Sequence, residues 1–291
     1  MFSKILIATD LSAASHAVVQ CATGLRSIGA RECHLLQCMN LSEAASMAAA
    51  NAKDVLEQAL LNQKAVLEKS GLKVKTEVVP GFAHVEINKV ANKRKCSLIV
   101  IGSHGHSLLG EILLGGVASA VIHHAVKPVL IIRVERNPKT GDVCARGETC
   151  NFIRHIFFPT DFSDNADHAF QTVKHLVGAG AKEVTLCHVQ DQVRLDPHLM
   201  HRLNEFNRID HERLAKMKEQ LARIGKANIH GNVCFGHPAE KILENIDAKK
   251  TTLVVMGSQG RGFVKDIFLG SVSHNIARRA PSPVLLIPGK R

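Results

Sequence analysis

Hydrophobic and polar positions along this chain predict strands and helices in regular succession. Short apolar runs that end at Gly, Pro, Asp or Thr are typical of buried strands, and the segments between them carry the apolar spacing of amphipathic helices. Strands that alternate with helices favour right-handed crossovers and a parallel sheet covered on both faces. The pattern therefore predicts an α/β fold of the doubly wound type.

The same succession of elements occurs twice. In the first half, strands are expected at 3–8, 33–39, 74–79, 98–101 and 128–134, and helices at 12–27, 42–70, 83–93 and 116–125. In the second half, strands are expected at 152–159, 183–189, 228–235, 253–256 and 283–288. Helices are expected there at 163–177, from Asp196-Pro197 to Gly225, at 238–249 and after Gly270.

The repeat sets the expected domain boundaries. Three loop glycines of the second copy stand 155 positions after their counterparts, which indicates two tandem units of about 140 residues, an ordinary size for one domain. Residues 135–151 are polar, contain Pro and Gly, and show no periodicity. We therefore expect a first domain at 1–134, a linker at 135–151 and a second domain at 152–291.

A glycine-rich loop follows the fourth strand of each copy. In the second copy, Gly257, two residues, Gly260, nine residues, Gly270 and Ser271 lead into a helix. Glycines let the backbone come close to a ligand, and a helix N-terminus offers free N–H groups and a partial positive charge. This arrangement is suited to an anion, and phosphate is the obvious candidate.

An aspartate follows the first strand of each copy, at Asp10 and Asp161. In a doubly wound sheet, ligands bind outside the carboxyl ends of the strands. If the first and fourth strands are neighbours, this carboxylate faces the glycine loop and can bind ribose hydroxyls while the loop binds phosphates. The alternative for a single aspartate at such a place is helix capping.

Composition excludes several other classes of function. The net charge of +11 suits polyanions, but Lys and Arg are spread along the chain and Tyr and Trp are absent, so nucleic-acid binding is not expected. No apolar run has the length of a membrane span, and the N-terminus lacks the features of a signal peptide. We expect a cytoplasmic protein that does not bind membranes.

Cysteine and histidine offer no defined metal site. Six cysteines, Cys21 among them, fall in or beside predicted strands and helices, as core thiols do. Cys144 and Cys150 lie in the expected linker at a spacing that matches no zinc pattern, which leaves a silent thiol pair or a regulatory disulfide. The histidines near the first glycine loop fix no coordination geometry: His104, His106, His123 and His124.

No catalytic residues are expected, because the loop is not a Walker A motif and no triad or carboxylate pair is evident.

These motifs together resemble the universal stress protein family, in a tandem form that covers nearly the whole chain. The family signature Gly-x2-Gly-x9-Gly-(Ser/Thr) is complete in the second copy, whereas Gly116 replaces the Ser or Thr in the first. The resemblance implies five-stranded parallel sheets of order 3-2-1-4-5 with helices on both faces. It also implies ATP, AMP or another adenine nucleotide as ligand, with or without Mg²⁺.

The resemblance also assigns the site residues by position. In the second copy they are Thr160, Asp161, Val189, Met256, Gly257, Gly260, Arg261, Gly270, Ser271 and Val272. In the first copy they are Thr9, Asp10, Cys38, Ile101, Gly102, Gly105, His106, Gly115, Gly116 and Val117. Because Ser271 and Arg261 add a hydroxyl and a cation, we expect the second site to bind more tightly.

Three functions remain open at this point. The leading hypothesis is a stress-response binding module whose adenine nucleotide regulates the packing of domains or chains. The alternatives are a slow ATP-hydrolysing or nucleotide-transferring enzyme of the same fold, and an interaction protein that binds no nucleotide. The apolar fifth strands, 128–134 and 283–288, are expected to pair the two domains within the chain, and a homodimer is also expected.

Overall fold

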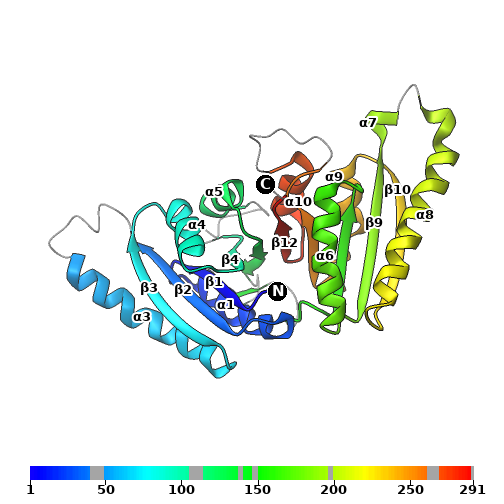
Figure 1. Ribbon diagram of the computed structural model, residues 1–291. Coiled ribbons are helices and arrows are strands. Elements are labelled where there is room, and N and C mark those ends of the chain that lie inside the picture. The colour runs from blue at the N-terminus through cyan, green and yellow to red at the C-terminus, as the bar shows by residue number, and fades with distance from the viewer. Residues whose placement is uncertain are drawn as a thin grey trace. The chain divides into compact units, whose positions relative to one another are not determined.

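The structure is a computed structural model that describes residues 1–39, 49–104, 114–136, 140–145, 150–195, 199–260 and 269–289. The chain divides into two compact units, Met1–Cys150 and Asn151–Arg291. Each unit contains its own five-stranded parallel arrangement with helices between the strands (Figure 1). Among the described residues, no helix combines the length and the apolar character that crossing a bilayer requires.

The first unit follows the predicted succession of elements. Its elements are β1 (Lys4–Thr9), α1 (Ala13–Ala22), η1 (Thr23–Ile28), β2 (Glu32–Met39), α3 (Ala49–Lys69), β3 (Lys73–Pro80), α4 (Ala83–Lys93), β4 (Leu98–Gly102), α5 (Gly116–His124), β5 (Val129–Ile132), β6 (Val134–Arg136) and β7 (Val143–Ala145). The expected N-terminal part of the long helix, 42–48, lies outside the described residues.

The second unit repeats this order, and two short helices, α7 and η2, precede its long helix. Its elements are β8 (His155–Thr160), α6 (Asp164–Gly178), β9 (Glu183–Asp191), α7 (Gln192–Leu195), η2 (Met200–Arg202), α8 (Leu203–Ala222), β10 (Asn228–Gly236), α9 (Pro238–Asn245), β11 (Leu253–Gly257), α10 (Ser271–Arg279) and β12 (Val284–Ile287).

Strand order within each unit is the one that the family resemblance implies. The first unit runs β3-β2-β1-β4-β5 and the second β10-β9-β8-β11-β12, which is 3-2-1-4-5 in both, and every pairing within these sets is parallel. α1 packs with α3, and α4 packs with α5 on the opposite face, as right-handed crossovers require. The predicted fold class is confirmed.

The strands form the core because helices cover both of their faces. Ile5, Leu6 and Ile7 of β1 and Leu253, Val254 and Val255 of β11 are fully buried. Burial of consecutive residues, rather than alternate ones, is characteristic of parallel sheets covered on both sides. This rigid core places the carboxyl ends of β1 and β4, and those of β8 and β11, side by side in their own units.

One helix boundary was predicted incorrectly. Asp196 and Pro197 carry the composition of a helix start, yet the long helix α8 begins at Leu203. The backbone N–H of Leu199 donates to the carbonyl of Leu195, and a 3₁₀ turn at Met200–Arg202 precedes α8. Asp196 and Pro197 themselves lie outside the described residues.

The segment expected as an irregular linker contains secondary structure. β6 and β7 pair in antiparallel fashion, with Val134 opposite Ala145, and both strands contact α1. Cys150 forms a disulfide with Cys21 of α1, with the Cα atoms 5.0 Å apart. The expectations that Cys21 is a free core thiol and that Cys150 pairs with Cys144 or stays silent are therefore wrong; Cys144 is free and exposed.

Candidate functional site

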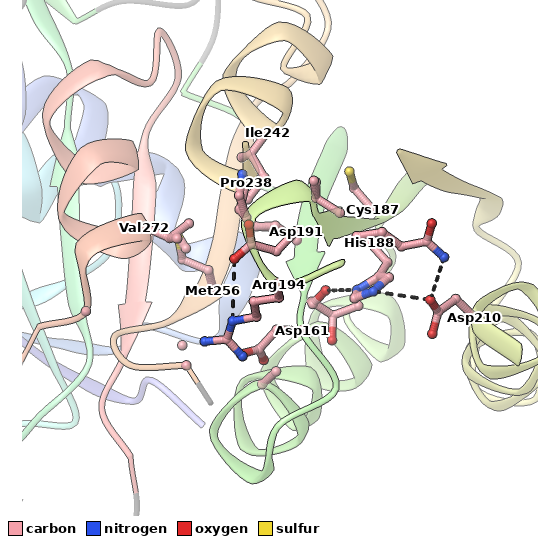
Figure 2. A pocket seen from close by; sticks show the side chains of 18 of the residues that line it. Asp161, Cys187, His188, Asp191, Arg194, Asp210, Pro238, Ile242, Met256 and Val272 are labelled. Carbon is pink, nitrogen blue, oxygen red and sulfur yellow. Dashed lines mark hydrogen bonds and ion pairs between the residues drawn. The ribbon is translucent and has the colours of Figure 1, made fainter. Parts of the chain in front are cut away.

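A cavity of about 510 Å³ opens at the carboxyl ends of β8, β9 and β11 in the second unit. Residues from the β8–α6 turn and from the loop after β11 form one wall, and residues of α7, α8 and α9 form others. Figure 2 shows a close view of this cavity. The parallel strand order places the cavity here, because the turns after β8 and β11 leave the sheet from neighbouring strands.

Asp161 shapes the turn after β8. Its Oδ1 accepts hydrogen bonds from the backbone N–H of Ser163 (3.1 Å) and from the Ser163 hydroxyl (2.6 Å). Ser163 in turn accepts from the N–H of Ala166 and is the N-cap of α6. The capping alternative is therefore partly correct: the serine caps the helix, and the aspartate holds the serine.

The residue after the aspartate has an unusual backbone conformation in both copies. Phe162 has φ +57° and Leu11 has φ +61°, a left-handed region that large side chains rarely adopt. In each copy the N–H of this residue donates to the preceding threonine hydroxyl, that of Thr160 or Thr9. Strain of this kind in two equivalent turns indicates that the position of the aspartate is important to the site.

The glycine loop after β11 passes directly beside this carboxylate. A Cβ atom built on Gly260 would lie 2.7 Å from Asp161 Oδ2, which is closer than real Cβ contacts. A Cβ on Gly257 would lie 3.1 Å from the carbonyl of Gln259 and 3.2 Å from that of Asn165. A side chain at Gly260 would therefore have to displace the Asp161 carboxylate.

The end of the loop is closed at the N-terminus of α10. The N–H of Gly270 donates to the carbonyl of Ser258 (2.8 Å), and the Ser273 hydroxyl donates to the same carbonyl (2.5 Å). Gly270 is the N-cap, and no side-chain hydrogen bond from the described residues caps α10 there. The first turn of α10, which includes Ser271 and Val272, thus faces the cavity with the donors of a helix N-terminus.

The structure brings nine of the ten predicted second-copy residues to the cavity lining, and the tenth, Arg261, lies outside the described residues. The nine are Thr160, Asp161, Val189, Met256, Gly257, Gly260, Gly270, Ser271 and Val272.

The corresponding first-copy residues lie at the matching places in the first unit. Thr9, Asp10, Cys38, Ile101 and Gly102 are at the ends of β1, β2 and β4, and Gly115, Gly116 and Val117 are at the start of α5. Gly105 and His106 lie outside the described residues. Asp10 Oδ1 accepts from the Ser12 hydroxyl as Asp161 Oδ1 does from Ser163, and it also accepts from the hydroxyl of Ser15, whose counterpart is Ala166.

Cys38 is a poor candidate for thiolate chemistry in the first copy. Burial raises the pKa of its thiol to about 12, and the charge of Glu86 adds to the effect. A neutral thiol is a small apolar group rather than a nucleophile or metal ligand. Cys38 can therefore border a ligand as its counterpart Val189 does.

One wall of the second cavity carries a polar cluster that the sequence motifs do not predict. His188, Gln190, Asp210 and Arg213 all line it, and all but Arg213 are buried. Asp210 faces inward on α8 together with Leu214, Met217 and Leu221. A carboxylate within an otherwise apolar stripe is the signal in the sequence that could have identified this wall.

Charged side chains of both signs surround the cavity. Arg194 of α7 lies 3.5 Å from Asp191, and Arg213 lies 3.3 Å from Asp210 (Figure 2 shows the first pair). Pro238, Ile242, Met256 and Val189 supply an apolar part of the lining. Among the described residues, no group of three or more His, Cys, Asp or Glu side chains is placed to hold a metal ion.

The chain is similar to known proteins over most of its length. The model of the universal stress protein family matches residues 1–133 and 153–288. A universal stress protein of Mycolicibacterium smegmatis is 28% identical over 239 residues, which are 81% of this chain and 76% of that protein. Another, of Methanocaldococcus jannaschii, is 30% identical over 156 residues, 47% of this chain and 96% of that protein.

A solved structure agrees with both the fold and the tandem arrangement. The crystal structure of a universal stress protein from Archaeoglobus fulgidus superimposes with a TM-score of 0.73 at 26% identity, and the match covers 99% of this chain and 97% of that one. One conclusion follows from the two family matches, the strand order that both units share, and the repeated turn at Asp10 and Asp161. The chain belongs to the universal stress protein family and carries two of its domains in tandem.

Proposed function

We propose that the second unit binds an adenine nucleotide of the ATP or AMP type in this cavity, and that the chain acts as a nucleotide-dependent regulatory module of the stress response. The observation that carries the proposal is the approach of the glycine loop to Asp161: a Cβ at Gly260 would lie only 2.7 Å from Oδ2. A carboxylate beside a phosphate-binding loop is a combination suited to a nucleotide. We expect the module to act in the cytoplasm.

The groups around the cavity match the parts of such a ligand. Asp161 accepts from ribose hydroxyls, while the loop from Gly257 to Gly260 and the first turn of α10 donate to phosphates. The apolar lining at Val189 and Met256 suits the faces of a base. Any Mg²⁺ would accompany the phosphates, because the described residues provide no metal site of their own.

Isothermal titration with ATP and AMP, with and without Mg²⁺, tests this proposal. Asp161→Asn keeps an acceptor for Ser163 but removes the negative charge, and Asp164→Asn on the exposed first turn of α6 is the matched control. A hydrogen bond to a charged group contributes about 1.5–3 kcal/mol, so roughly tenfold weaker binding or more is expected for Asp161→Asn alone. Wild-type protein without saturable binding at millimolar nucleotide contradicts the proposal.

The rival function is slow hydrolysis or nucleotide transfer at the same site. A phosphate-release assay with Mg²⁺ distinguishes the two: turnover that Asp161→Ala abolishes favours an enzyme, whereas tight binding without turnover favours the module. Adenine nucleotide retained in the purified chain would exclude the third hypothesis, an interaction protein that binds no nucleotide. The binding module is preferred because the carboxylate and the glycine loop account for binding by themselves, whereas hydrolysis also requires a positioned catalytic group.

A further inference from the structure

The buried histidine in the cavity wall stands between two acceptors. His188 is 5% exposed, and its Nδ1 lies 2.8 Å from the carbonyl oxygen of Thr160. A carbonyl can only accept, so Nδ1 must carry a proton. Its Nε2 lies 3.5 Å from Oδ2 of Asp210, which is also buried (Figure 2). The imidazolium form, with a proton on each nitrogen, satisfies both contacts, whereas the neutral form that donates to Thr160 presents a lone pair to a carboxylate.

Asp210 is held in place by groups other than the histidine. Gln190 donates to Asp210 Oδ2 from Nε2 (2.9 Å), and Arg213 donates to Oδ1 (3.3 Å). A carboxylate anchored in this way stays beside Nε2 and favours a proton there. Arg213 opposes this with its own positive charge, but it is directed to the other carboxylate oxygen. Among the described residues, the other charged groups that line the cavity are Asp161, Asp191 and Arg194.

This histidine contacts the strained turn from two sides. Through Nδ1 it fixes the carbonyl of Thr160, the residue before Asp161. Its ring packs against Phe162, the residue after Asp161, with 4.4 Å between ring centroids. Arg213 lies over Phe162 at 5.2 Å. Phe162 therefore lies in contact with both His188 and Arg213 while its backbone keeps the left-handed conformation that orients Asp161.

The first copy has no histidine at the position equivalent to His188. Thr160 pairs with His188 between β8 and β9, and the equivalent pair between β1 and β2 is Thr9 with Gln37. Leu11 stands at the place of Phe162. Gln37 carries no titratable group and donates to the carbonyl of Cys38. The two turns therefore share the aspartate and the serine cap but differ in what supports them.

We propose that His188 is a positioning residue of the second site: as an imidazolium held by Asp210 it fixes the Thr160–Asp161–Phe162 turn, and its deprotonation loosens Asp161 and weakens ligand binding. The proposal rests on the proposed nucleotide site for its functional consequence. Its structural part, the support of the turn by a protonated histidine, stands independently of any ligand.

Adenosine titrated at about pH 5.5 and about pH 8.5 tests the functional part, because it has no phosphate that ionises in this range. Wild-type affinity is expected to fall by roughly tenfold at the higher pH, since each unit of pKa coupling corresponds to a tenfold change in an equilibrium constant. His188→Gln, which introduces the residue of the first copy, should bind weakly at both values with the pH dependence lost. Asp210→Asn should reduce the dependence, and Asp164→Asn, on the exposed first turn of α6, is the charge-matched control.

A ligand-free measurement keeps the structural part testable. Nitrogen-15 shifts of the His188 ring should report both nitrogens protonated near neutral pH. Amide exchange of Phe162 and Ser163, compared between wild type and His188→Gln at one pH, should be faster in the variant. A pH dependence of binding that is unchanged in His188→Gln, or unchanged exchange at the turn, overturns the inference. Absence of nucleotide binding in wild type at every pH instead contradicts the proposed function, while the exchange result still decides the role of His188.

Discussion

Gly260 and Asp161 approach so closely that a single methyl group on the glycine would lie 2.7 Å from a carboxylate oxygen. The aspartate cannot easily retreat, because its other oxygen holds Ser163 at the start of α6. Loop and turn are therefore matched to each other, although 99 positions separate the two residues in the sequence.

Gly260→Ala should displace the Asp161 carboxylate and weaken nucleotide binding by roughly tenfold or more, since one charge-assisted hydrogen bond is lost. Titration calorimetry measures the effect. Gly178→Ala is the matched control, because its Cβ would only touch Ile224 at an ordinary 3.5 Å and the site is on an exposed helix end. Equal binding by the two variants would contradict the role given to the close approach.

Exchanging one residue between the two copies should change their relative affinities for nucleotide. Gly116→Ser restores the hydroxyl that the first loop lacks, and the position has room, because no atom lies within 4 Å of the added Cβ. The affinity of the first site should rise, and Ser271→Gly should lower the affinity of the second site. Each change should be roughly tenfold, because a hydrogen bond to a charged group contributes about 1.5 kcal/mol. Calorimetry on a Gly270→Val background isolates the first site. An unchanged affinity in both variants would show that the serine does not bind phosphate.

Acid should destabilise the second unit through His155. Burial lowers the pKa of this histidine below its ordinary value of 6.5, although the nearby charge of Glu183 acts in the opposite direction. The folded state therefore prefers neutral His155, and the unfolded chain binds the proton more readily. Its contribution to stability is present above about pH 6.5 and is lost as the pH falls from there toward the folded-state pKa.

His155→Gln should accordingly reduce the loss of stability between about pH 7.5 and about pH 5.5. Urea unfolding at the two values measures the change, and His201→Gln, on an exposed turn, is the control. A larger acid-induced loss in His155→Gln than in wild type would reverse the sign argued above.

Reduction of the Cys21–Cys150 disulfide should destabilise the first unit. The bond joins residues 129 positions apart, and the loss of loop entropy in the unfolded chain corresponds to at most about 5 kcal/mol. Urea unfolding with and without a dithiol reductant measures the difference in stability. Cys21→Ser should abolish this difference, whereas Cys144→Ser, at an exposed free cysteine, should leave it unchanged. In a reducing compartment such a bond is typically transient, so stability there should follow the redox state.

The fifth strands should drive association of separated domains. Within its own unit, each of β5 and β12 is the last strand, and each consists of four apolar residues. An apolar edge attracts another strand. Sedimentation equilibrium on the separated halves, 1–150 and 151–291, should show dimers, and the intact chain reports whether a homodimer also forms. Halves that stay monomeric at high concentration would contradict strand-edge pairing.

Most of the fold follows from the local pattern of apolar and polar residues in the sequence. The short apolar runs around Ile5, Leu98 and Leu253 predict buried strands, because their length and the turn residues that follow them are typical of parallel strands covered on both faces. The glycines at 257, 260 and 270, with Asp161 after the first strand, were sufficient to locate the cavity, because spacing in a loop and position at a strand end are properties that sequence carries directly. The start of α8 at Leu203 differs from the start expected at Asp196-Pro197, which lies outside the described residues.

Tertiary structure alone decided the contacts between residues distant in sequence. Cys21 and Cys150 lie in a helix and beyond a hairpin, and only the packing of β6 and β7 against α1 brings them together. The wall of the cavity formed by His188 and Asp210 depends on the packing of α8 against β9 and β10, so neither residue identifies the other in the sequence. Periodicity records which side of an element is buried. It does not record which buried polar groups will meet, because that depends on how whole elements pack.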